Sequence, residues 1–467
     1  MRYLSTRGRA PSLGFDEAVL AGLASDAGLY VPEQWPQVTA AEIAGFANVP
    51  FAEVARRVIP PFVGGAMPAA DLDAIIDTAW RGFSHPSVTP LVEIEPGHFV
   101  LELFRGPTLS FKDVAMQFLG PLMDALLAAR ERRATIVVAT SGDTGSAAIE
   151  AFAGRERVDV VVLHPEGRVS EVQRRQMTTV AEANVHNVAL KGSFDDCQRL
   201  VKAMFGNVPF RDEVALSGVN SINWGRIVAQ TVYYFKAAAD LGAPHRPVAF
   251  TVPTGNFGDV FSGYAATRMG LPVARLVVAT NANDILARAL ETGRYDTAPV
   301  QPTISPSMDI QVSSNFERLL FEATGRDAPA VSRMMNGLAQ SGGFAIPDAA
   351  LAGIRRDFAA SSASEAATRA VIADLFKRSG YLADPHTAVG VAVARRHLAP
   401  DIAMITLATA HPAKFPDAVA ASAGISPPLP PALADLHERP ERVTVLANDQ
   451  DAVERFVAQH TRARRSA

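Results

Sequence analysis

The stretch ATIVVATSGDTG, from Ala134 to Gly145, decides which fold class the chain is expected to adopt. Its first seven residues form a continuous, mainly apolar run, which is typical of a parallel strand buried on both faces. A glycine-rich turn follows directly, and a helical pattern begins after the turn. The runs RVDVVVL (157–163) and RPVAFTV (246–252) have the same character. Together these runs predict an α/β fold with at least one parallel sheet.

A second glycine-rich loop, TGNFGD (254–259), follows the run at 246–252. In open α/β sheets, ligands bind beyond the carboxyl ends of the strands. The loops SGDTG (141–145) and TGNFGD therefore mark where a binding site should be sought. Each loop, taken alone, could also be an ordinary strand-to-helix turn.

The length of 467 residues predicts more than one domain, because a single hydrophobic core rarely organises so long a chain. Residues 1–90 are expected to form short helices separated by proline and glycine, and TAAE at Thr39–Glu42 fits a capping box. From Leu91 onward, β-branched runs alternate with longer amphipathic stretches. Residues 91–425 are therefore expected to form a bilobal α/β region, with a smaller lobe at about 113–215.

The C-terminal tail, residues 426–467, has a different texture. It opens on PPLPPALADLHERPERV (427–443), whose proline density prevents regular structure. This segment is expected to be a connector that leads to a last strand and helix.

Composition and charge exclude several classes of function. A net charge of -4 with scattered lysines and arginines gives no electrostatic footprint for nucleic acid. No uninterrupted apolar run reaches membrane-spanning length, and the first residues lack the apolar core of a signal peptide. Cys197 is the only cysteine, so it is expected to be a small buried hydrophobe and not part of a disulfide or metal site. These features predict a cytoplasmic protein that binds small molecules.

Lys112 is the candidate for covalent chemistry. It lies in ELFRGPTLSFKDVAMQFLG (102–120), where Gly106 and Pro107 predict a turn and the residues after Asp113 predict a helix. A lysine that binds a carbonyl cofactor needs a pocket that favours its neutral amine. A lysine at a loop–helix junction is more often simply solvated, so the neighbouring motifs have to decide.

The two glycine-rich loops are suited to anions. In TGNFGD, glycines let backbone N–H groups converge on a phosphate at the start of a helix. In SGDTG, the hydroxyls of Ser141 and Thr144 and the backbone of Gly142 and Gly145 could bind a substrate carboxylate. Helix capping by Ser141 or Asp143 is the alternative.

The motifs FKD (111–113), SGDTG, GNFGD and TAHPAKF (409–415) follow one another in this order. With YLSTRG (3–8), SDAGLYVP (25–32) and NSINWGR (220–226), they resemble the threonine synthase family of fold-type II pyridoxal-phosphate enzymes, whose fold is of the tryptophan synthase β type. This resemblance extends through nearly the whole chain. It implies pyridoxal 5'-phosphate as cofactor and the conversion of O-phospho-L-homoserine and water into L-threonine and phosphate.

The resemblance also implies a set of site residues. Lys112 would form the Schiff base with the cofactor, and Thr409 would face its pyridine nitrogen. Asp143 would lie near the ring hydroxyl, where many relatives of this fold have asparagine. The cofactor phosphate would be held by Gly255, Asn256, Phe257, Gly258 and Asp259. The candidates for substrate binding are Ser141, Thr144, Asn223, Arg226 and Lys414, of which Arg226 and Lys414 would retain the departing phosphate.

Two other functions remain open from the sequence. One is a serine or threonine dehydratase of the same fold, and the other is a non-catalytic sensor of a phosphorylated ligand, against which the intact Lys112 argues.

His386 and His411 have no second ligand at a metal-binding spacing, so hydrogen bonding within the structure is expected for both and no metal is predicted. The chain is expected to be a monomer or a homodimer.

Overall fold

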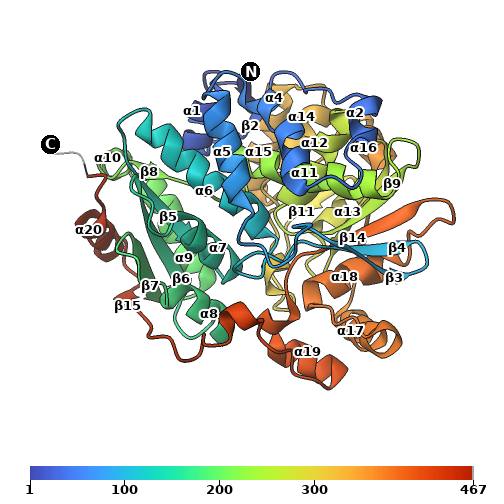
Figure 1. Cartoon of the computed structure of the whole chain (residues 1–467). Helices are drawn as coiled ribbons and strands as arrows, with labels where there is room; N and C mark the ends of the chain where they lie inside the picture. Colours follow the sequence, from blue (N-terminus) through green and yellow to red (C-terminus); the bar gives the residue numbers. More distant parts are fainter. Residues whose placement is uncertain (465–467) are drawn as a thin grey trace.

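The computed structural model describes residues 1–464 and contains two mainly parallel sheets with helices packed against them (Figure 1). The smaller sheet, at the left of the view, has the strand order β15-β7-β6-β5-β8, and all of its pairs are parallel. Its strands are β5 (Ala134–Ala139), β6 (Val158–Pro165), β7 (Val185–Lys191), β8 (Leu216–Ser217) and β15 (Thr444–Ala447).

The larger sheet has the strand order β13-β10-β9-β14-β4-β3. Its edge strand β3 runs antiparallel to β4, and the other pairs are parallel. Its strands are β3 (Leu91–Glu95), β4 (His98–Glu102), β9 (Val248–Pro253), β10 (Val273–Thr280), β13 (Phe358–Ser362) and β14 (Ala403–Ala408). Two short antiparallel pairs are β1 (Tyr3–Ser5) with β2 (Tyr30–Pro32) and β11 (Arg294–Asp296) with β12 (Gly343–Ala345). The expected fold class, two parallel-sheet α/β lobes with a helical N-terminal region, is confirmed.

The continuous apolar runs arise because helices cover both faces of the smaller sheet. Along β5, Ile136 and Val138 belong to the main hydrophobic core, whereas Val137 belongs to a second core. Cys197 is fully buried in this second core, as expected. Successive side chains of a strand point to opposite faces, so apolar surroundings on both faces favour an almost continuous apolar run. The helices that flank this sheet are α6 (Lys112–Ala128), α7 (Asp143–Phe152), α9 (Phe194–Gly206) and α20 (Gln450–His460).

The N-terminal region packs against α6 and the long helix α11 (Trp224–Asp240). Trp80 stacks on Phe118 of α6, with ring centroids 6.2 Å apart. The capping box predicted at Thr39 is confirmed, since its hydroxyl accepts from the backbone of the helix that it starts. The helices of this region are α1 (Phe15–Ala21), α2 (Ala40–Ala44), α3 (Phe51–Val58), α4 (Pro60–Val63) and α5 (Ala69–Ala79).

The C-terminal tail completes the smaller sheet. After α19 (Pro416–Ala423) the chain crosses from the larger sheet to the smaller one, where β15 pairs in parallel with β7 and α20 packs on α9. The Arg462 guanidinium then donates to Asp159 Oδ1 of β6 at 2.7 Å. The strand and helix expected in the tail are confirmed. The domain limits drawn from the sequence stay a prediction, and β15 belongs to the sheet of the smaller lobe.

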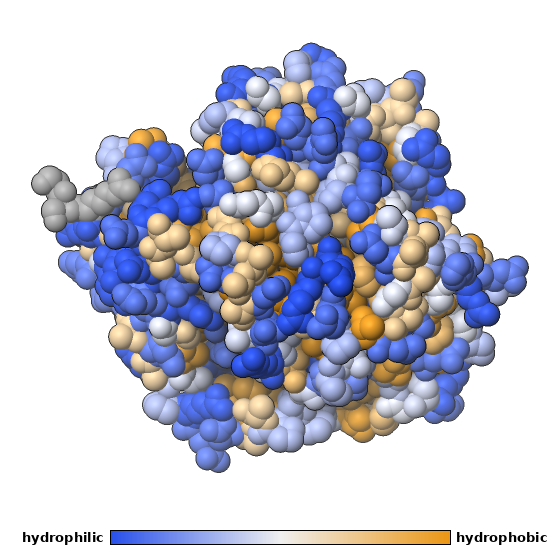
Figure 2. Space-filling model, turned by 45° about the horizontal axis from the view of Figure 1, so that its top comes forward, coloured by the Kyte–Doolittle hydropathy of each residue, from blue (hydrophilic) through white to orange (hydrophobic). Residues whose placement is uncertain are grey.

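The remaining helices pack around the two sheets. They are α8 (Glu171–Thr178), α10 (Val208–Glu213), α12 (Gly258–Arg268), α13 (Ile285–Thr292), η1 (Pro306–Met308), α14 (Phe316–Ala323), α15 (Ala328–Ser341), α16 (Asp348–Asp357), α17 (Glu365–Ser379), α18 (Pro385–Ala394), η2 (Pro412–Lys414) and η3 (Pro431–Leu433). Within residues 1–464, no helix combines the length and the hydrophobicity that a bilayer crossing requires. Hydrophilic residues predominate on the face seen in Figure 2, and apolar surface there forms small patches, several of them recessed.

The close contact between α6 and α7 gives a test of packing. A Cβ added at Gly120 would lie 2.3 Å from the carbonyl oxygen of Ala151. We therefore expect Gly120→Ala to lower the free energy of unfolding by about 1–3 kcal/mol, as measured by urea denaturation. Gly353 of α16 is the control, because a Cβ there meets no heavy atom within 4 Å. Gly353→Ala should stabilise by about 0.5–1 kcal/mol, and equal effects of the two changes would contradict this packing.

Candidate active site

Lys112 is the first residue of α6, and the loop before it runs beside the TAHPAKF segment that follows β14. The Phe111 amide donates to the Thr409 carbonyl at 2.8 Å, and the His411 amide donates to the Leu109 carbonyl at 3.0 Å. Two motifs that lie far apart in the sequence are therefore neighbours at the carboxyl edge of the larger sheet.

Asp113 shapes the turn that presents Lys112. Its carboxylate accepts hydrogen bonds from the Thr108 amide at 2.9 Å and from the Thr108 hydroxyl at 2.6 Å. The turn passes so close that a Cβ at Gly106 would lie 2.4 Å from Asp113 Cβ, which explains why glycine precedes Pro107. The turn and helix expected around Lys112 are both present.

The Lys112 amine lies in a nearly closed environment. Its Nζ atom is 3.3 Å from Asp143 Oδ2 and 4.7 Å from the centre of the Phe111 ring. Burial lowers the pKa of Lys112, and the neighbouring Asp143 opposes this shift. This environment is the one that a lysine acting through its neutral amine requires.

Asp143, at the start of α7, connects several parts of the site. Its Oδ1 atom lies 2.9 Å from Lys414 Nζ and accepts from the Gln173 amide at 2.8 Å. Its Oδ2 atom faces Lys112 and accepts from the Ser307 hydroxyl at 3.4 Å. Burial alone would raise the pKa of Asp143, but Lys414 and Lys112 hold it well below its usual range. Asp143 is therefore an ionised carboxylate between two lysines.

The SGDTG loop leads from β5 into α7. Thr140 fixes its shape, because its hydroxyl accepts from the amides of Gly142 and Gly145, both at 2.9 Å. Gly142 has φ of 140°, a conformation that favours glycine. Ser141 and Thr144 are half-buried, and neither hydroxyl bonds to another residue in the described part of the chain. Both hydroxyls are thus free to bind a ligand.

The GNFGD loop leads from β9 into α12. Phe257 has φ of 63°, and the helix begins at the next residue. The Ser313 hydroxyl donates to the Gly255 carbonyl at 2.6 Å, and the Asn315 side chain donates to the Asn256 carbonyl at 2.9 Å. Side chains thus hold the carbonyls of this loop, and the loop leads into the N-terminus of α12, an arrangement that suits the binding of an anion.

The side chain of Asp259 is buried and forms hydrogen bonds within the protein. Its carboxylate accepts hydrogen bonds from the hydroxyls of Tyr233 and Tyr234, the latter at 3.0 Å. Burial raises the pKa of Asp259 to about 6, against these hydrogen bonds and the charge of Arg226. The side chain of Asp259 therefore anchors α12 to α11, and its contribution to an anion site would come from the backbone.

Arg226 is a buried cation whose guanidinium has neither a carboxylate partner nor a carbonyl partner among the described residues. It is 3% exposed, its Nε atom has no hydrogen-bond partner, and its guanidinium forms no ion pair within residues 1–464. Burial lowers the pKa of Arg226 to about 10. A buried guanidinium without an anion is unfavourable, so its position points to an anionic ligand.

The other predicted residues are placed as follows. Thr409 is 6% exposed at the end of β14. Lys414 is fully buried, and its Nζ atom also donates to the Thr108 carbonyl at 2.7 Å. Asn223 caps α11, and its amide donates to the Val19 carbonyl at 2.8 Å. The structure thus brings Lys112, Asp143 and Lys414 together, whereas the side chain of Asn223 is occupied elsewhere, and its role with substrate stays a prediction.

Sequence reasoning missed Ser307 and Gln173, which both contact Asp143. Gln173 lies on α8, whose N-cap is Ser170, and Ser307 lies on η1 in the polar segment 303–315. The only signal in the sequence is the concentration of serine and proline in that segment, and this pattern is equally typical of an ordinary loop.

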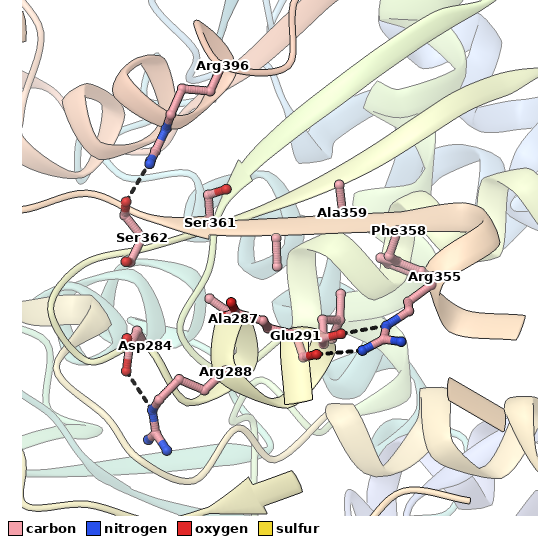
Figure 3. A pocket seen from close by; sticks show the side chains of 12 residues that line it. Asp284, Ala287, Arg288, Glu291, Arg355, Phe358, Ala359, Ser361, Ser362 and Arg396 are labelled. Carbon is pink, nitrogen blue, oxygen red and sulfur yellow. Dashed lines mark hydrogen bonds and ion pairs between the residues drawn. The ribbon is translucent and has the colours of Figure 1, made fainter. Parts of the chain in front are cut away.

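A surface pocket lies apart from this site, between α13 and the edge strand β13 (Figure 3). Its three arginines already have protein partners: Arg355 donates to the Leu290 and Glu291 carbonyls, Arg396 donates to the Ser362 carbonyl, and Arg288 donates to the Asp284 carboxylate. None of the sequence motifs contributes to its lining. The pocket therefore does not compete with the Lys112 region as the candidate site.

Comparison with known proteins assigns the chain to a family. Three family models match, namely Threonine synthase N terminus at residues 2–80, Pyridoxal-phosphate dependent enzyme at 83–353, and Threonine synthase, C-terminal at 387–457. The threonine synthase of Pseudomonas aeruginosa is 53% identical over 98% of both chains. The chain belongs to the threonine synthase family. The threonine synthase of Schizosaccharomyces pombe is 44% identical over 89% of this chain and 88% of its own.

Solved structures of the family agree with this assignment. The pyridoxal-phosphate-bound threonine synthase from Brucella melitensis has a TM-score of 0.97 and 57% identity over 99% of this chain and all of its own. The yeast threonine synthase has a TM-score of 0.93 and 37% identity over 98% of both chains. These matches confirm a pyridoxal-phosphate-dependent enzyme of the family and its cofactor. A threonine deaminase from Solanum lycopersicum, at 12% identity over 81% of this chain and 93% of its own and a TM-score of 0.51, shares the fold alone.

The turn before Lys112 gives a test by pH. Burial raises the pKa of Asp113 from 3.8 to about 6, against the hydrogen bonds from Thr108. Between these two pKa values the folded chain therefore binds more protons than the unfolded chain. The stability that Asp113 contributes is present below about pH 4 and is lost as the pH rises through about 6. The free energy of unfolding of the wild type, relative to Asp113→Asn, should fall by about 3 kcal/mol between about pH 4 and 7. Urea denaturation at each pH measures it, and a constant difference would contradict the raised pKa.

Proposed function

We propose that the chain converts O-phospho-L-homoserine and water into L-threonine and phosphate, the last step of threonine biosynthesis. The observation that carries this proposal is one compact group of buried residues: Lys112 beside Asp143, a glycine-rich anion loop, and Arg226 without a carboxylate partner. Membership of the threonine synthase family supports the named reaction.

The residues present fit pyridoxal phosphate. Lys112 has the buried amine that a carbonyl requires, and the loop from Gly255 to Asp259 offers its amides at the N-terminus of α12. A Cβ at Gly255 would lie 3.0 Å from the Ser307 carbonyl oxygen, so a larger residue there would have to displace this carbonyl. Lys112 would hold the aldehyde carbon, and Gly255, Asn256, Phe257, Gly258 and Asp259 would hold the phosphate. When bound, the cofactor supplies a ring that stabilises negative charge on the substrate α carbon.

Lys112 is the proton carrier in this proposal. When it is free, its Nζ atom would accept the proton of the substrate α carbon, because burial favours the neutral amine. The Asp143 carboxylate, 3.3 Å from Nζ, would stabilise the positive charge that then develops on this atom. The same amine can return a proton later in the reaction, so one lysine serves several steps.

Two residues would orient the cofactor ring. Asp143 would lie near the ring hydroxyl, and its negative charge is balanced by Lys414 at 2.9 Å. Thr409 would face the ring nitrogen with its hydroxyl, a neutral partner that leaves this nitrogen without a carboxylate. Because the Thr409 carbonyl accepts from Phe111, the residue is held beside the Lys112 turn.

The substrate would be held at both of its charged ends. The free hydroxyls of Ser141 and Thr144 would bind its carboxylate at the N-terminus of α7. Arg226 would bind its phosphate, since this guanidinium has no other anion within the described chain. Retained beside the β carbon, the departing phosphate could orient the attacking water. Lys414 and Asn223 are further candidates, but their side chains already have protein partners.

The reaction is tested with Lys112→Ala. The wild type, incubated with pyridoxal phosphate and O-phospho-L-homoserine, should release phosphate and threonine in equal amounts, and Lys112→Ala should be slower by at least about a thousandfold. Lys377→Ala, on the exposed surface of α17, is the control and should retain full activity. Phosphate without threonine would identify an eliminating lyase, and turnover of serine or threonine alone would identify a dehydratase. Full activity of Lys112→Ala would overturn the site.

The phosphate site is tested with Arg226. Loss of a charged hydrogen bond to the substrate is expected to reduce kcat/KM for O-phospho-L-homoserine about tenfold to a hundredfold in Arg226→Met. Arg226→Lys keeps the positive charge but loses the planar guanidinium, so its kcat/KM should lie between those of Arg226→Met and the wild type. Steady-state phosphate release measures both. An unchanged kcat/KM in Arg226→Met would remove Arg226 from the substrate site.

A further inference from the structure

Ser307 contacts three functional segments at once. Its amide donates to His386 Nε2 at 3.2 Å, its hydroxyl donates to Asp143 Oδ2 at 3.4 Å, and its carbonyl oxygen lies 3.0 Å from where a Cβ of Gly255 would be. Ser307 therefore joins the smaller lobe, through Asp143, to the glycine-rich loop after β9.

His386 is oriented for this contact by Asp384. Its Nδ1 atom lies 2.7 Å from Asp384 Oδ2, and the two residues are 3% and 1% exposed. The Asp384 carboxylate is itself fixed, because it caps α18 by accepting from the amides of His386 and Thr387. With Nδ1 donating to the carboxylate, Nε2 is left as an acceptor, which the Ser307 N–H requires.

The contact replaces a missing local cap. The N-cap residue of η1, Ser305, makes no side-chain hydrogen bond to the first turn. The Ser307 N–H lies in that turn and would otherwise lack an acceptor. His386, distant in sequence, supplies this acceptor and so adds to the contacts that hold η1, among them the hydrogen bond from the Asn281 amide to the Ser305 hydroxyl at 3.0 Å.

We propose that His386, held by Asp384, is a positioning residue that fixes Ser307 against Asp143 and Gly255. It thereby sets the distance between Asp143, which lies between Lys112 and Lys414, and the loop that the proposed function assigns to the cofactor phosphate. This inference rests on that proposed function. His386 acts through Ser307 and does not itself touch the reacting atoms.

Three substitutions at one position separate this role from simple packing. In His386→Gln the side-chain amide oxygen can reach the place of Nε2 and still accept from Ser307. In His386→Asn the amide replaces Nδ1 and keeps Asp384 but loses that acceptor, and His386→Ala loses both. Holoenzymes of all three are compared with His397→Ala, a histidine just beyond α18 that bonds Ser361.

The expected result is a loss confined to the variants without the acceptor. His386→Asn and His386→Ala should bind pyridoxal phosphate about tenfold more weakly, by titration of its absorbance, and should lower kcat about tenfold with little change in KM. His386→Gln should recover most of both values, and His397→Ala should match the wild type. Ser307→Ala, which keeps the N–H but removes the hydroxyl, should not add fully to His386→Ala.

Several outcomes would overturn the proposal. These are equal losses in His386→Gln and His386→Ala, full additivity with Ser307→Ala, or wild-type cofactor affinity in His386→Asn. If His386→Ala does not fold, the comparison of the glutamine and asparagine variants still decides. If the wild type forms no threonine, the proposed function fails, while cofactor affinities across the series still test the positioning role.

Discussion

The site depends on one buried carboxylate that lies between two lysines. Asp143 comes from the smaller lobe, and Lys414 comes from the segment after the last strand of the larger sheet. Buried charges are unfavourable unless they are paired and hydrogen-bonded, so this pairing holds the two lobes in a defined relation. Arg226 lies in the same region and has no carboxylate partner within residues 1–464. An anionic ligand would therefore supply the missing partner charge of this guanidinium.

The motifs YLSTRG (3–8) and SDAGLYVP (25–32) support the site from a distance. The Thr6 hydroxyl and the Arg7 guanidinium both bind Glu317 at the start of α14. The next residue, Arg318, is fully buried and donates to the Tyr30 carbonyl. Its guanidinium also contacts Asn315, which holds the glycine-rich loop after β9. The N-terminal region thus supports the proposed phosphate loop through two layers of side chains, without contributing a residue to it.

Much of the fold could be predicted from the sequence, because its strands are continuous apolar runs and its loops are marked by glycine. The run at 134–140 and the turn before Lys112 are local features, and both were predicted. The contacts of Asp143 with Gln173 and Ser307 could not be predicted, since they depend on how distant segments pack. Asn223 shows that a residue can also be assigned a role from its motif that its surroundings do not support. Its motif suggested a role with substrate, but an asparagine before a helix is also a good cap, and only the surrounding backbone decides between these roles.

The crossing of the tail from the larger sheet to the smaller one also has a consequence for biosynthesis. The strand that completes the edge of the smaller sheet, Thr444–Ala447, is made after every other strand of the two sheets. A sheet that formed before β15 was made would leave the edge of β7 with unpaired backbone groups, available to another strand. The lobe that carries Asp143 thus reaches its final form only when synthesis of the tail is complete. The sheet of the smaller lobe, although most of it comes earlier in the sequence, is therefore the last to gain all of its strands.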